Sequence, residues 1–145
     1  MKLLSATPKY LLGLVLFFIM GSSQMYAQES ANDTQITSML FSFYKGYIAE
    51  NSKIPVDPIQ INSIREKYCT RELIQKLGKV ELDHDPFLNT QDCKESWLKT
   101  LVIKKDPHAK EIFVISFFDA ESKSKMIVKL RVQKQNKIFK ISAIL

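Results

Sequence analysis

The sequence predicts an α+β domain in which N-terminal helices pack on a four-stranded antiparallel sheet. Two observations support this fold class. Apolar residues recur every three or four positions up to about residue 77, which is the helical period, and from residue 97 they alternate as in strands. Helical segments followed by consecutive strands are typical of helices packed on one face of an antiparallel sheet.

The first predicted helix covers residues 34–49. Asp33 or Thr34 can cap its start, because a side-chain oxygen there accepts a hydrogen bond from a free N–H of the first turn. One face of this helix is apolar and should face the core, and its members are Ile36, Met39, Leu40, Phe43, Tyr44 and Tyr47.

Two shorter helices should follow. The pair Asp57 and Pro58 is a typical helix start, because proline in the first turn gives up no hydrogen bond. The apolar residues of this helix are Ile61, Ile64 and Tyr68. Thr70 should begin the next helix, with Leu73, Ile74 and Leu77 facing inward. Gly78 should end it in the left-handed conformation.

Four strands are predicted at residues 97–104, 111–118, 125–133 and 137–144, with turn residues in every gap, which indicates a meander. In the third strand the apolar residues Met126, Val128, Leu130 and Val132 alternate with Lys129, Arg131 and Gln133, so one face should be buried. The second strand is apolar on both faces. Another loop of the chain, a ligand or a second subunit should cover its second face, so a homodimer through the sheet is one of three alternatives.

The N-terminus resembles a secretory signal peptide. Lys2 and Lys9 accompany an apolar run at residues 10–20, which is shorter than a membrane-spanning helix, and Ser22, Ser23 and Ala27 suit an exit and a cleavage site. We therefore expect a signal peptide over residues 1–27 and a single domain over residues 28–145, located in the periplasm or secreted. The alternative is an uncleaved membrane anchor.

Charge and cysteine content narrow the functional classes to which the protein could belong. The formal net charge is +6, but acidic and basic residues alternate along the chain, so a nucleic-acid partner is not expected. Cys69 and Cys93 are far from the C-x-x-C spacing of redox enzymes. In an exported domain they are expected to form a structural disulfide.

The segment 82–93 is the richest in potential ligands, namely Asp83, His84, Asp85, Asn89 and Asp92. It has no glycine and contains Pro86 and Phe87, so it does not match a calcium-binding loop. Asp85 and Asp92 are expected to cap turns, while Phe87 and Leu88 fill the core. No metal, cofactor or catalytic residue is predicted, and the five polar residues are instead a candidate interaction loop.

Three stretches carry a family resemblance: Phe43-Tyr44-x-x-Tyr47-Ile48, Lys67-Tyr68-Cys69-Thr70 with Leu73, and Asp83-x-Asp85-Pro86-Phe87-Leu88-x-x-Gln91-Asp92-Cys93. Their order resembles the bacterial domain-of-unknown-function 3828 family, over nearly the whole of residues 28–145. The resemblance implies a small exported or envelope protein with a cystatin-like fold of the nuclear-transport-factor-2 type, in which helices pack on a curved antiparallel sheet. It brings no established reaction and no catalytic residues.

These observations favour a non-catalytic binding or interaction protein of the bacterial periplasm or envelope, with an envelope protein as its partner. The outer face of the sheet and the loop 83–92 are the two candidate surfaces. The alternative is a domain whose pocket binds a small apolar ligand, or a degenerate hydrolase using Asp83, His84 or Asp85 as acid-base groups.

Overall fold

A computed structural model describes the backbone of residues 9–145 and the side chains of residues 28–145. The chain divides into two compact units, residues 1–34 and residues 35–145. The first eight residues of the predicted signal peptide lie outside the described residues, and the cleavage site stays a prediction. Within the described part of the chain, no helix combines the length and the apolar character needed to cross a membrane.

Helix α1 runs from Lys9 to Asn51, so it begins well before the predicted cap. The segment contains no proline, and Thr34 does not cap a start because its hydroxyl donates to the carbonyl of Ser30 within the helix (3.0 Å). The predicted core-facing stripe is confirmed. Its fully buried members are Leu40, Phe43, Tyr44 and Tyr47, joined by Ile48.

Helix α2 spans Pro58–Tyr68, and the carboxylate of Asp57 caps it by accepting from the N–H of Ile59 (2.9 Å), as predicted. Helix α3 spans Arg71–Leu77, and Thr70 Oγ1 accepts from the N–H of Leu73 (3.3 Å). The left-handed stop is wrong, because Gly78 has a right-handed φ of −70°. The chain continues into a turn in which the N–H of Lys79 donates to the carbonyl of Lys76 (3.2 Å). This turn needs no residue with a positive φ.

The sheet contains β1 (Val102–Lys105), β2 (Ile112–Asp119), β3 (Ser124–Gln135) and β4 (Ile138–Ile144), antiparallel and in sequence order. The predicted meander and α+β class are confirmed. Residues Glu95–Thr100 form a 3-10 helix, η1, where a strand was expected. At this point the Thr100 hydroxyl forms the two hydrogen bonds that a neighbouring strand would form with Phe118. Its Oγ1 donates to Phe118 O (3.2 Å) and accepts from Phe118 N (2.9 Å).

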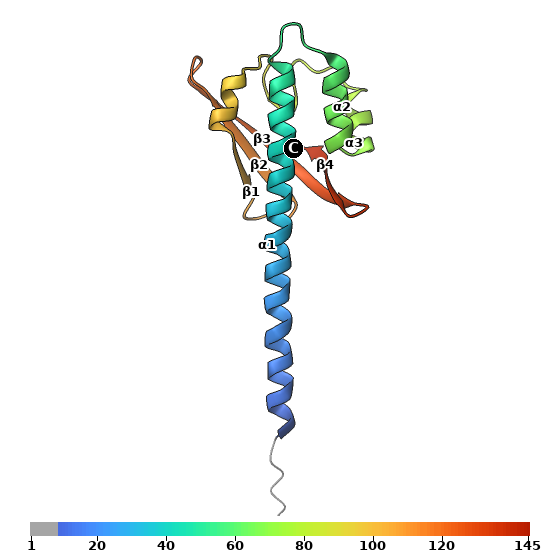
Figure 1. Cartoon of the computed structure of the whole chain (residues 1–145), viewed down its shortest axis with the longest axis vertical. Coiled ribbons are helices and arrows are strands. Elements are labelled where there is room, and N and C mark those ends of the chain that lie inside the picture. The colour runs from blue at the N-terminus through green and yellow to red at the C-terminus, as the bar shows by residue number, and fades with distance from the viewer. Residues whose placement is uncertain (1–8) are drawn as a thin grey trace, which may run out of the picture. The chain divides into compact units, whose positions relative to one another are not determined.

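One core joins the helices to the inner face of the curved sheet (Figure 1). Helices α2 and α3 contact β4, whereas η1 contacts β2. The inner face contributes Phe113, Ile115, Phe117, Val128, Leu130, Val132 and Ile141, all buried. Burial in β3 alternates as predicted, and together these contacts give the domain the contiguous apolar core that a chain of this size needs.

A buried carboxylate, Asp119, ties the segment before η1 to the β2–β3 turn. It accepts hydrogen bonds from Ser122 Oγ (2.9 Å), from the N–H of Glu121 (3.1 Å) and from Lys94 Nζ (3.1 Å). Burial alone would raise the pKa of Asp119. The hydrogen bonds and the Lys94 charge outweigh it and lower the pKa from 3.8 to about 2.

The depressed pKa predicts acid sensitivity. A carboxylate with a lower pKa in the folded state stabilises the fold at pH above about 3.8, and this contribution is lost as pH falls toward about 2. Asp119→Asn should therefore unfold at a lower temperature than the wild type at pH 7, and the difference should disappear by about pH 2. Thermal unfolding at a series of pH values measures this, and a difference that does not vary with pH would contradict it.

Candidate functional site

Asp85 organises the predicted interaction loop from within. Its Oδ1 accepts from the N–H groups of Phe87 (2.8 Å) and Leu88 (3.2 Å), and its own N–H donates to Thr90 O (3.0 Å). Phe87 and Leu88 are buried in the core. The turn-capping role of Asp85 and the core role of the two apolar residues are therefore confirmed. The predicted capping role of Asp92 is wrong. In that turn the side chain of Thr90 is the acceptor, because Thr90 Oγ1 accepts from the N–H of Asp92 (3.3 Å).

The other oxygen of Asp85 belongs to a polar cluster that sequence reasoning missed. Tyr47 OH donates to Asp85 Oδ2 (2.6 Å), and Arg65 Nη2 lies 3.5 Å from the same oxygen. Arg65 also donates to Tyr47 OH through Nε (3.1 Å) and Nη2. Burial, reinforced by the charge of Asp85, raises the pKa of Tyr47. The phenol therefore stays protonated and serves to connect α1, α2 and the loop.

The remaining loop residues do not converge. Asp83, His84, Asn89 and Asp92 are exposed, and Asn89 has a positive φ of 54°, typical of asparagine in a turn. Among the described residues there is no group of three His, Cys, Asp or Glu side chains that could hold a metal ion. The loop as an interaction surface stays a prediction.

The predicted disulfide is not formed in this structure, in which both cysteines are free thiols. Cys93 Sγ lies 3.4 Å from Ser52 Oγ and 3.5 Å from Ile48 O, at the end of α1. Cys69 lies between α2 and α3 and pairs through its backbone with Ile141 of β4. The two cysteines therefore contact different elements, Cys69 the strand β4 and Cys93 the end of α1.

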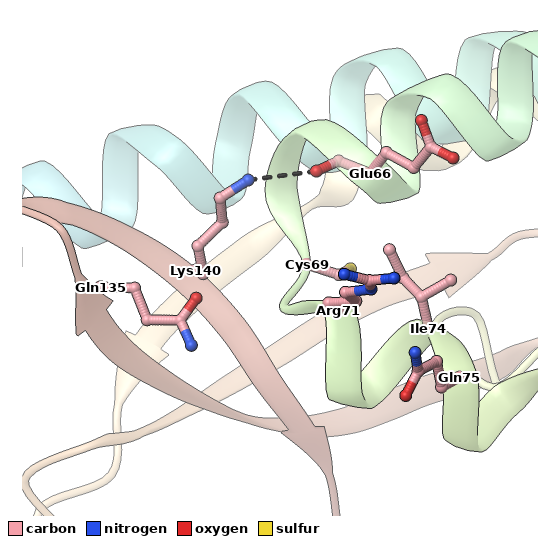
Figure 2. Close-up of a pocket in the computed structure, with 7 residues that line it drawn as sticks. All are labelled: Glu66, Cys69, Arg71, Ile74, Gln75, Gln135 and Lys140. Atoms are coloured by element: carbon pink, nitrogen blue, oxygen red, sulfur yellow. Dashed lines mark hydrogen bonds between the residues drawn. The ribbon is translucent and has the colours of Figure 1, made fainter.

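A cleft of about 510 Å³ opens where the end of α2 and the start of α3 meet the β3–β4 hairpin (Figure 2). Cys69 and Ile74 are its less polar lining residues, and the polar ones are Glu66, Arg71, Gln75, Gln135 and Lys140. Burial raises the pKa of the Cys69 thiol to about 12. This thiol stays protonated at neutral pH and is a poor nucleophile.

The outer face of the sheet presents a second feature, an apolar area open to solvent. The register places Val102 and Ile127 on either side of Ser116, across three strands. Val102, Phe118 and Ile127 are 42%, 43% and 48% exposed, and Val114 is half-buried. The described chain thus leaves most of this face uncovered. We call Val102, Val114, Phe118 and Ile127 the outer sheet patch.

Four cationic side chains lie on the same face of the sheet as the outer sheet patch. Each lies opposite a β2 residue of that face in the register: Lys104 and Lys129 opposite Val114, Lys125 opposite Phe118, and Arg131 opposite Ile112. Lys129 pairs with Asp106 at 3.5 Å. The face therefore combines exposed apolar side chains at Val102, Phe118 and Ile127 with basic side chains next to them.

The fold and these surfaces define a small α+β domain with an open sheet face and a polar cleft. A solved structure of a protein of unknown function from Bacteroides thetaiotaomicron is similar, with a TM-score of 0.67 and 22% sequence identity. The match covers 90% of this chain and 98% of that chain, and at this identity it shows the fold alone.

No protein-family model matches the chain, and no curated protein matches it either. The resemblance to the domain-of-unknown-function 3828 family therefore stays a prediction. Its structural implication, helices on a curved antiparallel sheet, agrees with the observed fold.

Proposed function

We propose that this chain is an exported, non-catalytic binding protein of the bacterial periplasm or envelope that holds a protein partner on its outer sheet patch. The observation that carries the proposal is the group of exposed apolar side chains on three adjacent strands, in particular Phe118 and Ile127. Contiguous exposed apolar area rimmed by polar residues is characteristic of protein interaction sites.

The charges around the patch indicate what kind of partner fits. Lys104, Lys125, Lys129 and Arg131 would favour an apolar protein surface bordered by Asp and Glu side chains. A second copy of this chain docked face to face would instead bring these four cations near four more, which is unfavourable. The charge pattern thus supports a different protein over the homodimer through the sheet.

The alternatives have weaker support. The cleft is lined mainly by charged and amide side chains, which suits a small apolar ligand poorly. Of the suggested acid-base groups, Asp85 is engaged in turn hydrogen bonds and in the pairs with Tyr47 and Arg65. Asp83 and His84 are exposed and form no pair with Asp85 in the described structure. A hydrolase would need such groups to face a shared substrate position.

The patch predicts a specific loss of binding. Phe118→Glu combined with Ile127→Glu should weaken capture of an envelope protein about 100-fold, because two apolar anchors are replaced by charges. A photo-crosslinking residue at Ser116, in the centre of the patch, should attach the captured protein through an apolar segment bordered by acidic residues. Binding should also weaken at high salt, since the rim is charged.

The matched control is Ile59→Glu, which places the same charge on α2 at a side chain that is 77% exposed. This variant should bind as the wild type does. Capture that survives the double substitution would contradict the proposal, as would a crosslink at Ser116 to a second copy of this chain with a dimeric mass in light scattering.

A further inference from the structure

We infer that the cleft between α2, α3 and the β3–β4 hairpin is a binding site for a small carboxylate-bearing ligand, which Arg71 and Lys140 hold by its carboxylate. This site shares no residue with the outer sheet patch, so the inference goes beyond the proposed function. It rests on four features of the cleft: two cations without an ionic partner, two unpaired amides, the direction of its one acid, and its size.

Arg71 supplies the first cation. It is exposed at the start of α3 and lines the cleft (Figure 2). Its guanidinium forms no hydrogen bond or ion pair with any residue in the described part of the chain. A guanidinium offers five N–H donors in a planar fork that matches the two oxygens of a carboxylate.

Lys140 supplies the second cation, and the fold holds it in place. Its Nζ donates to the carbonyl oxygens of Glu66 (3.1 Å) and Lys67, at the C-terminal end of α2. These two contacts use two of the three ammonium donors, and neither neutralises the charge, because both acceptors are carbonyls. One donor remains for a ligand, and the partial negative charge at the end of α2 offsets only part of the ammonium charge.

The cleft has one acid, Glu66, and its carboxylate is not used against these cations. Figure 2 shows the Glu66 side chain extending away from Lys140, whose contact is with the Glu66 backbone. Within residues 28–145, Glu66 forms no ion pair with Arg71 or Lys140. The lining therefore has an excess of positive charge, which favours an anion.

The remaining lining sets the size and polarity of the ligand. Gln75 and Gln135 add side-chain amides that have no partner in the described structure. Cys69 and Ile74 provide a small, less polar surface that suits a short aliphatic chain. The volume of about 510 Å³ lies within the range of small-molecule sites. A short aliphatic carboxylate, free or at the C-terminus of a peptide, fits these features.

The test uses hexanoate, hexanamide, inorganic phosphate and the peptide acetyl-Ala-Ala-Leu with a free C-terminus, followed by ¹H–¹⁵N NMR on the folded protein. Hexanoate or the peptide should shift resonances of Arg71 and Gln75 with a Kd of about 1 mM or tighter, and hexanamide should not. Arg71→Gln should weaken this binding about tenfold, because a charge-assisted pair is lost. Tighter binding of the peptide than of hexanoate would identify a peptide terminus as the source of the carboxylate.

Lys76→Gln is the matched control, since it removes one charge from α3 at an exposed position outside the cleft lining. It should bind hexanoate like the wild type. Failure of both carboxylates to bind, binding that Arg71→Gln leaves unchanged, or a preference for phosphate would each overturn the inference. None of these results bears on the outer sheet patch, because capture of the protein partner is measured separately.

Discussion

Asp85→Ala is expected to lower the free energy of unfolding by about 3 kcal/mol, more than the loss of any other polar side chain in the loop 83–92. The carboxylate accepts two backbone N–H bonds that shape the turn and a third bond from Tyr47 OH, and it faces the charge of Arg65. Alanine leaves all of these donors without their acceptor in a partly buried site. Denaturant unfolding followed by circular dichroism measures the loss.

The control for this substitution is Asp83→Ala, two positions earlier in the same loop. The Asp83 side chain is exposed, and the loop uses only its backbone carbonyl, which accepts from Gln91 Nε2 (2.9 Å). Its replacement should change the free energy of unfolding by less than about 0.5 kcal/mol. If both variants were equally stable, Asp85 would not be the organising residue of the loop.

A double-mutant cycle with Tyr47→Phe identifies the pair responsible. Tyr47→Phe removes the hydroxyl that joins Asp85 to Arg65, so the two changes should couple by about 1 kcal/mol.

The structural role of Asp85 also decides how the loop 83–92 can be tested for binding. Substituting Asp85 alters the structure of the whole loop, so lost binding in such a variant would not place a partner there. Asp83, His84 and Asp92 are the positions at which the loop can be tested cleanly.

The fold could be predicted because each element carries a local signal. The helix caps Asp57 and Thr70 lie next to apolar positions at helical spacing, and apolar and polar residues alternate in β3 from Val128 to Gln133. The strand order followed from short turns that leave a meander as the simplest connection. The first strand was predicted to begin at residue 97, but the chain forms η1 there. The hydroxyl of Thr100 at the end of η1 pairs with the backbone of the distant strand β2. Nothing local to that segment reveals such a contact.

The candidate sites were less predictable because they are assembled from distant parts of the chain. Tyr47, Arg65 and Asp85 meet only after three elements pack, and the sequence pattern of α1 marked Tyr47 merely as a core residue. Arg71 and Lys140 line the same cleft because α3 contacts β4. The outer sheet patch had a signal, the two-sided apolar pattern of β2. Recognising it as exposed required the register with β1 and β3.

The cysteines show the opposite error. Two thiols in a chain that is expected to be exported suggest a disulfide on composition alone, but composition does not say where the side chains lie. Cys69 is held against β4, whereas Cys93 contacts the end of α1. The stability that a disulfide would have supplied must then come from packing, which gives the buried aromatic residues particular weight.

Trp97→Ala is expected to lower the free energy of unfolding by about 4 kcal/mol, the largest effect of any substitution in η1. Trp97 is 1% exposed and stacks on Phe117 of β2, with ring centroids 5.0 Å apart and an interplanar angle of 23°. Alanine would remove this contact and leave a cavity between η1 and the sheet. Denaturant unfolding monitored by far-ultraviolet circular dichroism measures the change, since the chain contains no other tryptophan to report by fluorescence.

Trp97→Phe should lower the free energy of unfolding far less, by about 1 kcal/mol. The indole Nε1 is buried and has no hydrogen-bond partner in the described structure, so its N–H is a destabilising group that phenylalanine eliminates. The ring stacking on Phe117 is kept, but the cost of the smaller cavity exceeds the gain from losing the N–H, which leaves the small net loss. Equal losses for the two variants would mean that the indole N–H finds a partner after all, and that η1 is held to the sheet by a polar contact as well as by packing.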